Sequence, residues 1–326
     1  MKCKSAILIL LSAILLSACG HAADSFELQS FGEVFASENA VFCMENGTVS
    51  MYALNGKLLD TVQISASDLR YDTAENRAVI FGENEILISN GKDIKHNYIN
   101  SKIMSTNINR NGNIALCAEE AGYKGAVTVY DENFTALYKW YSASAWIIKA
   151  ALSEKNTLAV LTADENGSTV RVFEPDSEEE SFSLSIPKTL AIDICFMGDR
   201  LCILSDKAAY FAHEDKITET VSFDRTLGEY AMTDKRLVLE MQNGDGTGEL
   251  LSFDEKGRRC GSADCEMLRC LRANGEIAAA LCGDGAVLFD NDLRKNGSTE
   301  AAGVRSVMLC GENMLLLRDG GVFAYK

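Results

Sequence analysis

The sequence predicts an all-β chain folded as a single β-propeller, and three observations support this. A unit of two short strands recurs along the chain after residue 30. It recurs about every 39 residues, close to the interval of four-stranded propeller blades. Beyond the N-terminal segment, no apolar stripe of helical period runs for about 12 residues or more. The chain has 326 residues, 47% of them hydrophobic, which is enough to bury a core of this size.

The N-terminus has the features of a lipoprotein signal. Lys2 and Lys4 precede an apolar run over 6–16, which is shorter than the roughly 20 residues of a membrane-spanning helix. The following Leu-Ser-Ala-Cys-Gly (16–20) resembles a bacterial lipobox, so we expect cleavage before Cys19 and acylation of its thiol. This gives a signal peptide at 1–18, an acylated tether at 19–25 and a propeller domain at 26–326. An ordinary signal peptide or a short membrane anchor with a chance cysteine is the alternative.

These features place the protein outside the cell, on the outer face of the cytoplasmic membrane. The chain has 47 acidic and 31 basic residues, a net charge of −16, and cleavage would remove two lysines and no acid. Such an acidic surface excludes nucleic acid as a natural partner and does not adhere to anionic lipid. We therefore expect the N-terminal lipid, and not surface charge, to anchor the protein.

The repeat consists of an apolar strand, a tight polar turn, and a second strand that usually ends in an aromatic residue. The first strand of each pair is apolar on both faces, as expected for strands buried between stacked sheets. Turns rich in Asp, Asn and Gly separate the units. The predicted pairs are 40–44 with 48–52, 78–81 with 85–88, 114–118 with 126–130, 158–161 with 169–173, 201–204 with 208–211, 237–240 with 250–253, 277–281 with 286–289, and 314–317 with 322–325.

The ends of the chain predict how the ring closes. The last unit stops at Lys326, just after its third strand, and so lacks a fourth. Residues 25–30 alternate between polar and apolar and precede the first full unit, so they are suited to supply it. Pairing of the N- and C-terminal strands would cover an exposed sheet edge. We expect eight blades, with seven as the alternative.

The stretch from Asn111 to Val160 contains Gly-Tyr-Lys at 122–124, Val-Thr-Val-Tyr-Asp at 127–131 and Tyr-Lys-Trp-Tyr-Ser at 138–142. This succession resembles an uncharacterised family of propeller-like proteins of Gram-positive anaerobes. The resemblance implies a WD40-like or quinoprotein-like propeller outside the membrane and carries no catalytic residues. Many members of this family begin with a transmembrane anchor, so the lipobox of this sequence departs from the family pattern in its means of attachment to the membrane.

Cysteine is abundant and histidine is scarce, with 11 and 3 residues respectively. Six cysteines lie in predicted strands or at their ends, where a thiol serves as a small apolar core residue. These are Cys43, Cys117, Cys195, Cys202, Cys282 and Cys310. Cys260, Cys265 and Cys270 lie around a loop. A Cys260–Cys265 disulfide is one alternative for them and a zinc site another, although no CxxC pair or nearby histidine completes the ligands.

No other motif predicts a metal, a cofactor or catalysis. His21 falls in the tether, and His96 and His213 fall in polar turn regions. The loop 243–249 is Gly-rich and lacks the ligand spacing of an EF-hand, so it is best interpreted as a hairpin turn. Nucleophile, zinc-protease, phosphate-loop and dinucleotide motifs are absent.

Both tryptophans fall in one aromatic group, formed by Tyr138, Trp140, Tyr141 and Trp146. Strand alternation places Tyr138 and Trp140 on one face and Tyr141 on the other. Packing between blades is the simplest interpretation of this group. A rim surface for a glycan or a protein partner is the alternative, and these four are the candidate ligand residues.

The function that the sequence favours is a monomeric, non-enzymatic binding or scaffold propeller, with an envelope protein or glycan as partner. The alternative is an envelope glycan hydrolase or lyase, with carboxylates at the propeller channel. Asp193, Asp234 and Glu276 lie near expected blade starts and are the carboxylates that such an enzyme would use. A quinoprotein would rest on fold analogy alone.

Overall fold

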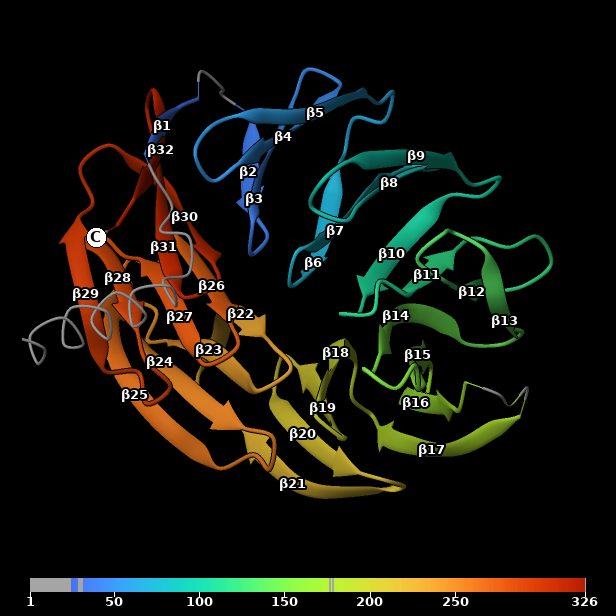
Figure 1. Ribbon diagram of the computed structural model, residues 1–326. Helices are drawn as coiled ribbons and strands as arrows, with labels where there is room; N and C mark the ends of the chain where they lie inside the picture. The colour runs from blue at the N-terminus through green and yellow to red at the C-terminus, as the bar shows by residue number, and fades with distance from the viewer. Residues whose placement is uncertain (1–24, 29–31, 176, 178, 326) are drawn as a thin grey trace, which may run out of the picture.

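The computed structural model describes residues 25–28, 32–175, 177 and 179–325. This part of the chain forms eight four-stranded antiparallel sheets that follow one another around a ring (Figure 1). The expected eight-bladed propeller is confirmed, and the seven-bladed alternative is wrong. The signal peptide at 1–18, Cys19 and all of the tether except Ser25 lie outside the described residues. Among the described residues, no helix is long and apolar enough to cross a membrane.

The first four blades occupy residues 33 to 187. Blade 1 contains β2 (Glu33–Ala36), β3 (Ala40–Glu45), β4 (Thr48–Ala53) and β5 (Leu58–Gln63). Blade 2 contains β6 (Arg70–Ala74), β7 (Arg77–Gly82), β8 (Glu85–Ser89) and β9 (Ile94–Tyr98). Blade 3 contains β10 (Ile103–Ile108), β11 (Ile114–Ala118), β12 (Gly125–Tyr130) and β13 (Ala136–Ser142). Blade 4 contains β14 (Trp146–Leu152), β15 (Leu158–Asp164), β16 (Gly167–Phe173) and β17 (Glu180–Pro187).

The remaining blades complete the ring. Blade 5 contains β18 (Ala191–Met197), β19 (Arg200–Ser205), β20 (Ala208–His213) and β21 (Lys216–Ser222). Blade 6 contains β22 (Thr226–Met232), β23 (Arg236–Gln242), β24 (Thr247–Asp254) and β25 (Arg259–Glu266). Blade 7 contains β26 (Cys270–Asn274), β27 (Ile277–Leu281), β28 (Gly285–Phe289) and β29 (Lys295–Glu300). Blade 8 contains β30 (Val304–Cys310), β31 (Asn313–Arg318), β32 (Gly321–Ala324) and β1 (Phe26–Glu27).

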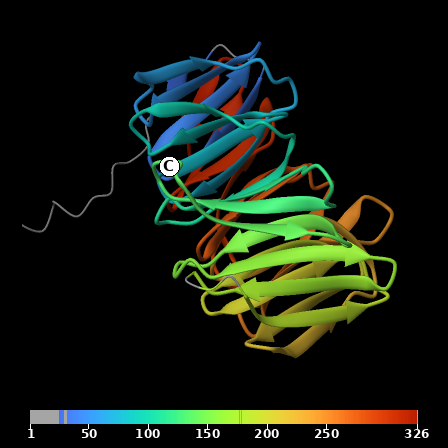
Figure 2. The same ribbon diagram turned by 90° about the vertical axis from the view of Figure 1, so that its right-hand side faces the viewer.

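The hydrophobic core is divided into eight layers, one between each pair of neighbouring blades. Figure 2 shows the sheets stacked face against face around the ring. The second and third strands supply most of each layer. All five residues of β8 and of β11 are buried, so these strands carry no polar alternation. Because such strands are buried on both faces, they occur in the sequence as short apolar runs, and these runs made the repeat detectable.

The ring closes where the N-terminal strand enters blade 8. Phe26 in β1 pairs with Val322 in β32, and the Leu28 amide donates to the Gly320 carbonyl at 3.2 Å. Gly56, in the turn between β4 and β5 of blade 1, has a φ of +81°. A Cβ at this position would lie 2.5 Å from Cβ of Phe26, so only glycine fits the contact that joins the two ends of the ring. The predicted closure is confirmed.

The ring has two faces, which the direction of the strands distinguishes. The proximal face carries the turns from first to second strands, such as 75–76 and 109–113, and Ser25 lies there, just before β1. There the Ser25 hydroxyl accepts a hydrogen bond from the amide of Ala324, at the end of β32. The distal face carries the turns from second to third strands, such as 83–84, and the connections between blades, such as 143–145. The first strands run between the two faces and line the central channel.

Candidate functional site

Two cavities occupy the central channel, and they share Tyr71 and Asp72 as a common wall. The proximal cavity has a volume of about 290 Å³ and is bounded by the turns that follow the first strands. The distal cavity has a volume of about 470 Å³ and is bounded by the first strands of blades 1 to 6. The polar side chains at the boundary of the two cavities form the candidate functional site.

Lys149 and Asp193 form the central ion pair of this site, with Lys149 Nζ 2.6 Å from Asp193 Oδ1. The Ile194 amide donates to the same oxygen at 2.7 Å, and the Tyr230 hydroxyl donates to Asp193 Oδ2 at 3.1 Å. The pair bridges blades 4 and 5, and Tyr230 adds blade 6. Asp193 is only 8% exposed, so the ion pair belongs to the channel and not to the outer surface.

Irregularities in the first strands position these side chains. The strand pairing shifts between Ile147 and Lys149 in β14 and between Ala191 and Asp193 in β18. A further shift precedes Tyr230 in β22. An extra residue in one strand re-aims the side chain beside it, and such bulges are frequent at the rims of closed sheets. Each of the three polar residues therefore follows a bulge that turns it into the channel.

Asp72 is the second carboxylate of the site. Its Oδ2 accepts hydrogen bonds from Asn107 Nδ2 at 3.0 Å and from the Ile108 amide at 2.9 Å, and its Oδ1 accepts one from the Thr73 amide. Burial raises the pKa of Asp72 above its ordinary value, while the charge of Lys149 and these hydrogen bonds act in the opposite direction. Asp72 thus fastens blade 2 to blade 3 at the level of the ion pair.

Burial and neighbouring charges fix the protonation states of the surrounding groups. Burial acts to lower the pKa of Lys149, but the Asp193 and Asp72 carboxylates raise it, and the net effect keeps the ammonium charged. Burial, followed by the charge of Asp193, raises the pKa of the Tyr230 phenol. Burial raises the pKa of the Cys195 thiol to about 12. At neutral pH the lysine is therefore a poor base, and the thiol and the phenol are poor nucleophiles.

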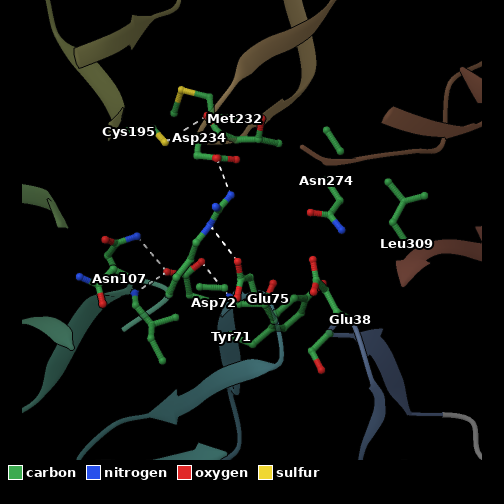
Figure 3. Close-up of a pocket in the computed structure, with 18 of the residues that line it drawn as sticks. Glu38, Tyr71, Asp72, Glu75, Asn107, Cys195, Met232, Asp234, Asn274 and Leu309 are labelled. Atoms are coloured by element: carbon green, nitrogen blue, oxygen red, sulfur yellow. Dashed lines mark hydrogen bonds and ion pairs between the residues drawn. The ribbon is translucent and has the colours of Figure 1, made fainter. Parts of the chain in front are cut away.

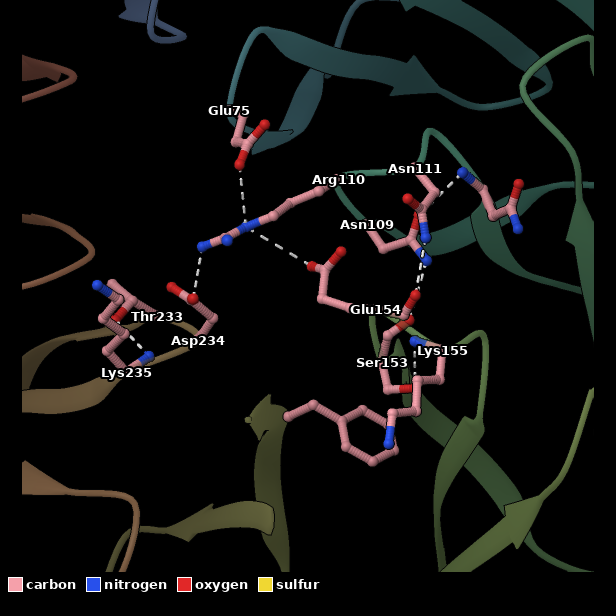
Figure 4. Close-up of polar contacts among 12 residues, drawn as sticks. Glu75, Asn109, Arg110, Asn111, Ser153, Glu154, Lys155, Thr233, Asp234 and Lys235 are labelled. Atoms are coloured by element: carbon pink, nitrogen blue, oxygen red, sulfur yellow. Dashed lines mark hydrogen bonds and ion pairs between the residues drawn. The ribbon is translucent and has the colours of Figure 1, made fainter. Parts of the chain in front are cut away.

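Arg110 spans the proximal mouth of the channel (Figure 4). From the turn of blade 3, its Nε lies 3.3 Å from Glu75 of blade 2 and 3.7 Å from Glu154 of blade 4. Its Nη2 lies 2.5 Å from Asp234 of blade 6, on the other side of the mouth. Figure 3 shows Glu75 and Asp234 among the residues that line the proximal cavity. One guanidinium thus holds three carboxylates from three other blades, and it partly covers this end of the channel.

The distal face of blades 3 and 4 exposes aromatic side chains. Tyr141 is 41% exposed, Trp146 is 58% exposed, and the ring of Tyr123 lies 4.8 Å from that of Tyr141. Lys124 Nζ lies 4.4 Å from the ring centre of Trp146, and Lys139 Nζ lies 4.8 Å from that of Tyr141. These five residues form what we call the aromatic patch. It combines aromatic rings with ammonium groups that contact the faces of two of them.

The four aromatic residues singled out from the sequence are divided between two environments. Tyr138 and Trp140 pack against Phe173 of blade 4, with ring centres 5.9 and 5.6 Å away. Tyr141 and Trp146 instead belong to the aromatic patch. The expected alternation along the strand is confirmed, and interblade packing applies to only two of the four. A ligand role for these residues remains a prediction.

The three candidate carboxylates do not converge on one point. Asp193 lies in the channel, Asp234 lies at the proximal mouth under Arg110, and Glu276 lies outside both cavities. Among the described residues, Glu276 forms an exposed ion pair with Lys235 at 3.5 Å. The sequence missed Asp72, Lys149 and Tyr230. The bulges before Lys149 and Tyr230 leave no signature in residue spacing, although all three residues lie in the first strands that a propeller directs at its channel.

The cysteines expected in the core are buried, apart from the half-buried Cys195, and all nine described cysteines are free thiols. The Cys260–Cys265 disulfide is wrong, because both residues lie in β25. Five residues of strand separate them by roughly 16 Å and place them on opposite faces. His96 is also not in a turn, since it lies in β9 and its Nε2 is 2.8 Å from Glu85. No three of the described His, Cys, Asp and Glu side chains are grouped to hold a metal.

Comparison with known proteins identifies the fold. No family model and no curated protein matches the sequence. BamB from Moraxella catarrhalis superposes with a TM-score of 0.60 at 10% identity, covering 94% of this chain and 99% of that one. Sqt1 from Saccharomyces cerevisiae gives 0.63 at 11% identity, covering 93% and 98%. The computationally designed protein Ika8 gives 0.66 at 15% identity, covering 94% and 99%.

The chain is a β-propeller. These solved structures share that architecture over nearly their whole length, so the propeller part of the family resemblance is confirmed. Identities this low show the fold alone, and propellers serve many unrelated functions. What this propeller does must therefore be argued from its own channel and faces.

Proposed function

We propose that this protein is a membrane-anchored lipoprotein outside the cytoplasmic membrane, where its propeller acts as a non-enzymatic binding or scaffold module. The anchor is proposed from the lipobox at Cys19 and from the cationic and apolar segments that precede it. Kinship with the uncharacterised propeller-like family of Gram-positive anaerobes is part of the same proposal. It rests on the segment from Asn111 to Val160.

The proposal of a non-enzymatic function rests on the hydrogen bonds and the pKa values of the ionisable side chains in the channel. Asp193 accepts three hydrogen bonds and Asp72 accepts three, which leaves both carboxylates committed to the protein itself. The pKa of Cys195 is raised to about 12, and the pKa values of Lys149 and Tyr230 are raised as well. A hydrolase or lyase needs a group poised to exchange a proton near neutral pH, and Lys149, Tyr230 and Cys195 are held away from that range. Burial raises the pKa of Asp72, but its oxygens are occupied by the Thr73 and Ile108 amides and by Asn107.

The distal face is the surface that we propose for an envelope protein or glycan. Eleven large hydrophobic side chains are exposed among the described residues, and seven of them lie on this face. The seven are Tyr98, Tyr123, Tyr141, Trp146, Leu190, Ile192 and Met267. Exposed aromatic residues that lie together, as Tyr123, Tyr141 and Trp146 do in the aromatic patch, are typical of contact surfaces.

The direction of β1 determines which face the tether would leave free. β1 starts at the proximal face, beside the end of β32, and runs toward the distal face. Residues 19–24 would span roughly 20 Å at most between the lipid and Ser25. We therefore propose that the proximal face is the nearer one to the membrane. The aromatic patch then points away from the bilayer.

The anchor is tested by metabolic labelling with a fatty acid and by membrane fractionation. We expect the wild-type chain to carry label and to sediment with membranes, and we expect Cys19→Ala to lose both properties. A Cys19→Ala chain that keeps the label and stays in membranes would overturn the anchor.

The binding surface is tested by recovery of partners from intact envelopes with three forms of the full chain. These are the wild type, the double variant Tyr141→Ala/Trp146→Ala, and Leu137→Ala. Leu137 is 57% exposed but lies on the proximal side of β13, so it controls for loss of apolar surface. We expect a partner recovered by the wild type and Leu137→Ala to be lost with the double variant. Equal recovery by all three forms would contradict the proposed surface.

A further inference from the structure

Two cysteines of blade 5 face each other across its first two strands. Cys195 of β18 pairs with Cys202 of β19, and the register around them is regular from Asp193 to Met197. Residues directly opposed in an antiparallel pair carry their side chains on the same face of the sheet. Among the described residues, no other cysteine is opposed by a cysteine in a strand pair. The two thiols are therefore neighbours by strand register.

The spacing of such a pair matches that of a disulfide. Directly opposed residues have Cα atoms roughly 4.5 to 5.5 Å apart, and a disulfide joins Cα atoms roughly 4.4 to 6.8 Å apart. The Cβ atoms of the pair need to approach by about 1 Å. Both cysteines are free thiols in the structure, which therefore shows the reduced pair. An S–S bond between them requires no change of strand register.

The pair faces blade 6. Cys202 is fully buried in the core layer between blades 5 and 6, together with Met197, which follows Cys195 by two residues on the same face of β18. The Cys195 thiol donates to the carbonyl of Thr233 in blade 6, with a distance of 3.6 Å from Sγ to the oxygen. Because Cys202 has no exposed surface, any reaction of the pair with a reagent must begin at Cys195.

Cys195 can be reached from the proximal cavity. It is half-buried and lines that cavity, which has a volume of about 290 Å³ and a mouth partly covered by Arg110. This volume is near the lower limit for a small-molecule pocket, roughly 300 Å³, so the cavity has room for a small reagent and not for another protein. The oxidant that fits this access is a low-molecular-weight disulfide.

We propose that Cys195 and Cys202 are a redox-active dithiol that a low-molecular-weight disulfide oxidises to an intramolecular disulfide. The Cys195 thiolate attacks one sulfur of the reagent and releases one molecule of the reagent's thiol. The Cys202 thiolate then attacks Cys195 Sγ in the mixed disulfide and releases the second. The S–S bond of the reagent breaks, one S–S bond forms in the protein, and the two released thiols carry away two protons and two electrons.

Burial controls the rate of the first step. It raises the pKa of the Cys195 thiol to about 12; the Lys149 ammonium opposes this rise, and the Asp193, Asp72 and Asp234 carboxylates add to it. The thiolate is the nucleophile, and below the pKa its fraction increases about tenfold for each unit of pH. Oxidation of the pair should therefore be slow at neutral pH and faster in alkaline solution.

The chemistry of the pair depends neither on the lipid anchor nor on the aromatic patch. Only its occurrence in the cell rests on the proposed function, which places the propeller outside the membrane, where thiols are readily oxidised. Purified protein tests the pair by itself. A failure there leaves the proposed anchor and binding surface standing, and a failure of either of these leaves the dithiol standing.

The test is oxidation of the fully reduced full-length chain, in a neutral detergent, with bis(2-hydroxyethyl) disulfide. Trypsin cleaves after Arg200, between the two cysteines, and so places them in separate peptides, 189–200 and 201–207. We expect these peptides to be joined after oxidation and to separate on reduction. We expect the rate of joining to rise about tenfold from pH 7 to pH 8. No joined peptide, or a stable reagent adduct at Cys195, would overturn the proposal.

Variants separate the roles of the two thiols. In Cys202→Ala only the first step can occur, so we expect a stable reagent adduct at Cys195. In Cys195→Ala we expect no adduct at Cys202, because Cys202 is fully buried. Cys265→Ala removes a buried thiol of blade 6 and should leave the joined peptides unchanged. An adduct at Cys202 in Cys195→Ala, or no adduct at Cys195 in a folded Cys202→Ala chain, would contradict the assigned order of attack. The wild-type test holds whatever a variant does to folding.

Discussion

The two faces of this propeller differ although the same repeat builds both. On the proximal face, Arg110 joins carboxylates from three other blades across the channel mouth, and the chain begins its first strand there. On the distal face, the channel widens into a cavity and aromatic side chains are exposed beside it. The charged groups of the proximal mouth lie in the turns between first and second strands. Tyr141 and Trp146 of the distal face instead lie at or near the ends of β13 and β14.

The largest expected effect comes from removing the cation that pairs with Asp193 in the channel. Lys149→Met leaves the carboxylates of Asp193 and Asp72 in the channel without their counter-ion. We expect the free energy of unfolding to fall by about 2 kcal/mol at pH 8, measured by urea denaturation.

The loss in free energy of unfolding caused by Lys149→Met should depend on pH. Burial already raises the pKa of Asp72, and without Lys149 the charge that opposes this rise is lost, so the folded-state pKa of Asp72 lies further above its unfolded value. The folded chain then binds protons more tightly than the unfolded chain, so stability decreases as the pH rises. We therefore expect the deficit of Lys149→Met to be smaller at pH 5 than at pH 8. A deficit that grows toward pH 5 would contradict the role assigned to the lysine.

Replacement of Arg110 should leave the proximal mouth of the channel as open to small molecules as the distal mouth. Arg110→Gln removes a side chain that is 40% exposed, so we expect a loss of less than about 1 kcal/mol of stability. Cys195 lines the cavity behind Arg110, and we expect its reaction with a small neutral disulfide reagent to become several-fold faster. Cys202, fully buried on the neighbouring strand, serves as the internal control. Unchanged reactivity of Cys195 would show that Arg110 does not restrict this mouth.

The smallest expected effect on stability comes from the distal face. Trp146 is more than half exposed, so Trp146→Ala should change the free energy of unfolding by no more than about 0.5 kcal/mol. Trp140 is half-buried against Phe173, and Trp140→Ala should cost clearly more. Thermal unfolding of the two variants makes this comparison. Equal losses would show that Trp146 is a packing residue and not a contact surface.

The sequence predicted the architecture well because burial on both faces leaves a mark in residue order. The apolar runs of the second strands and the turn residues between units predicted eight blades, and the unpaired last unit predicted the closure by Phe26. The channel was much harder to predict. Asp193 was recognised only by its place near a blade start, and Lys149 was missed. Nothing in one strand indicates which residues of other blades it will face.

The most direct test of the account is the orientation of the anchored protein, and the chain contains a natural probe for it. Both of its tryptophans lie at or near the distal ends of β13 and β14. A matched proximal probe is Leu58→Trp in a chain where Trp140 and Trp146 are replaced by Phe. Leu58 is 52% exposed at the proximal end of β5. In liposomes with nitroxide-labelled lipid headgroups, we expect the proximal tryptophan to be quenched more strongly than the native pair. Stronger quenching of the native pair would show that the distal face meets the membrane and would contradict the account.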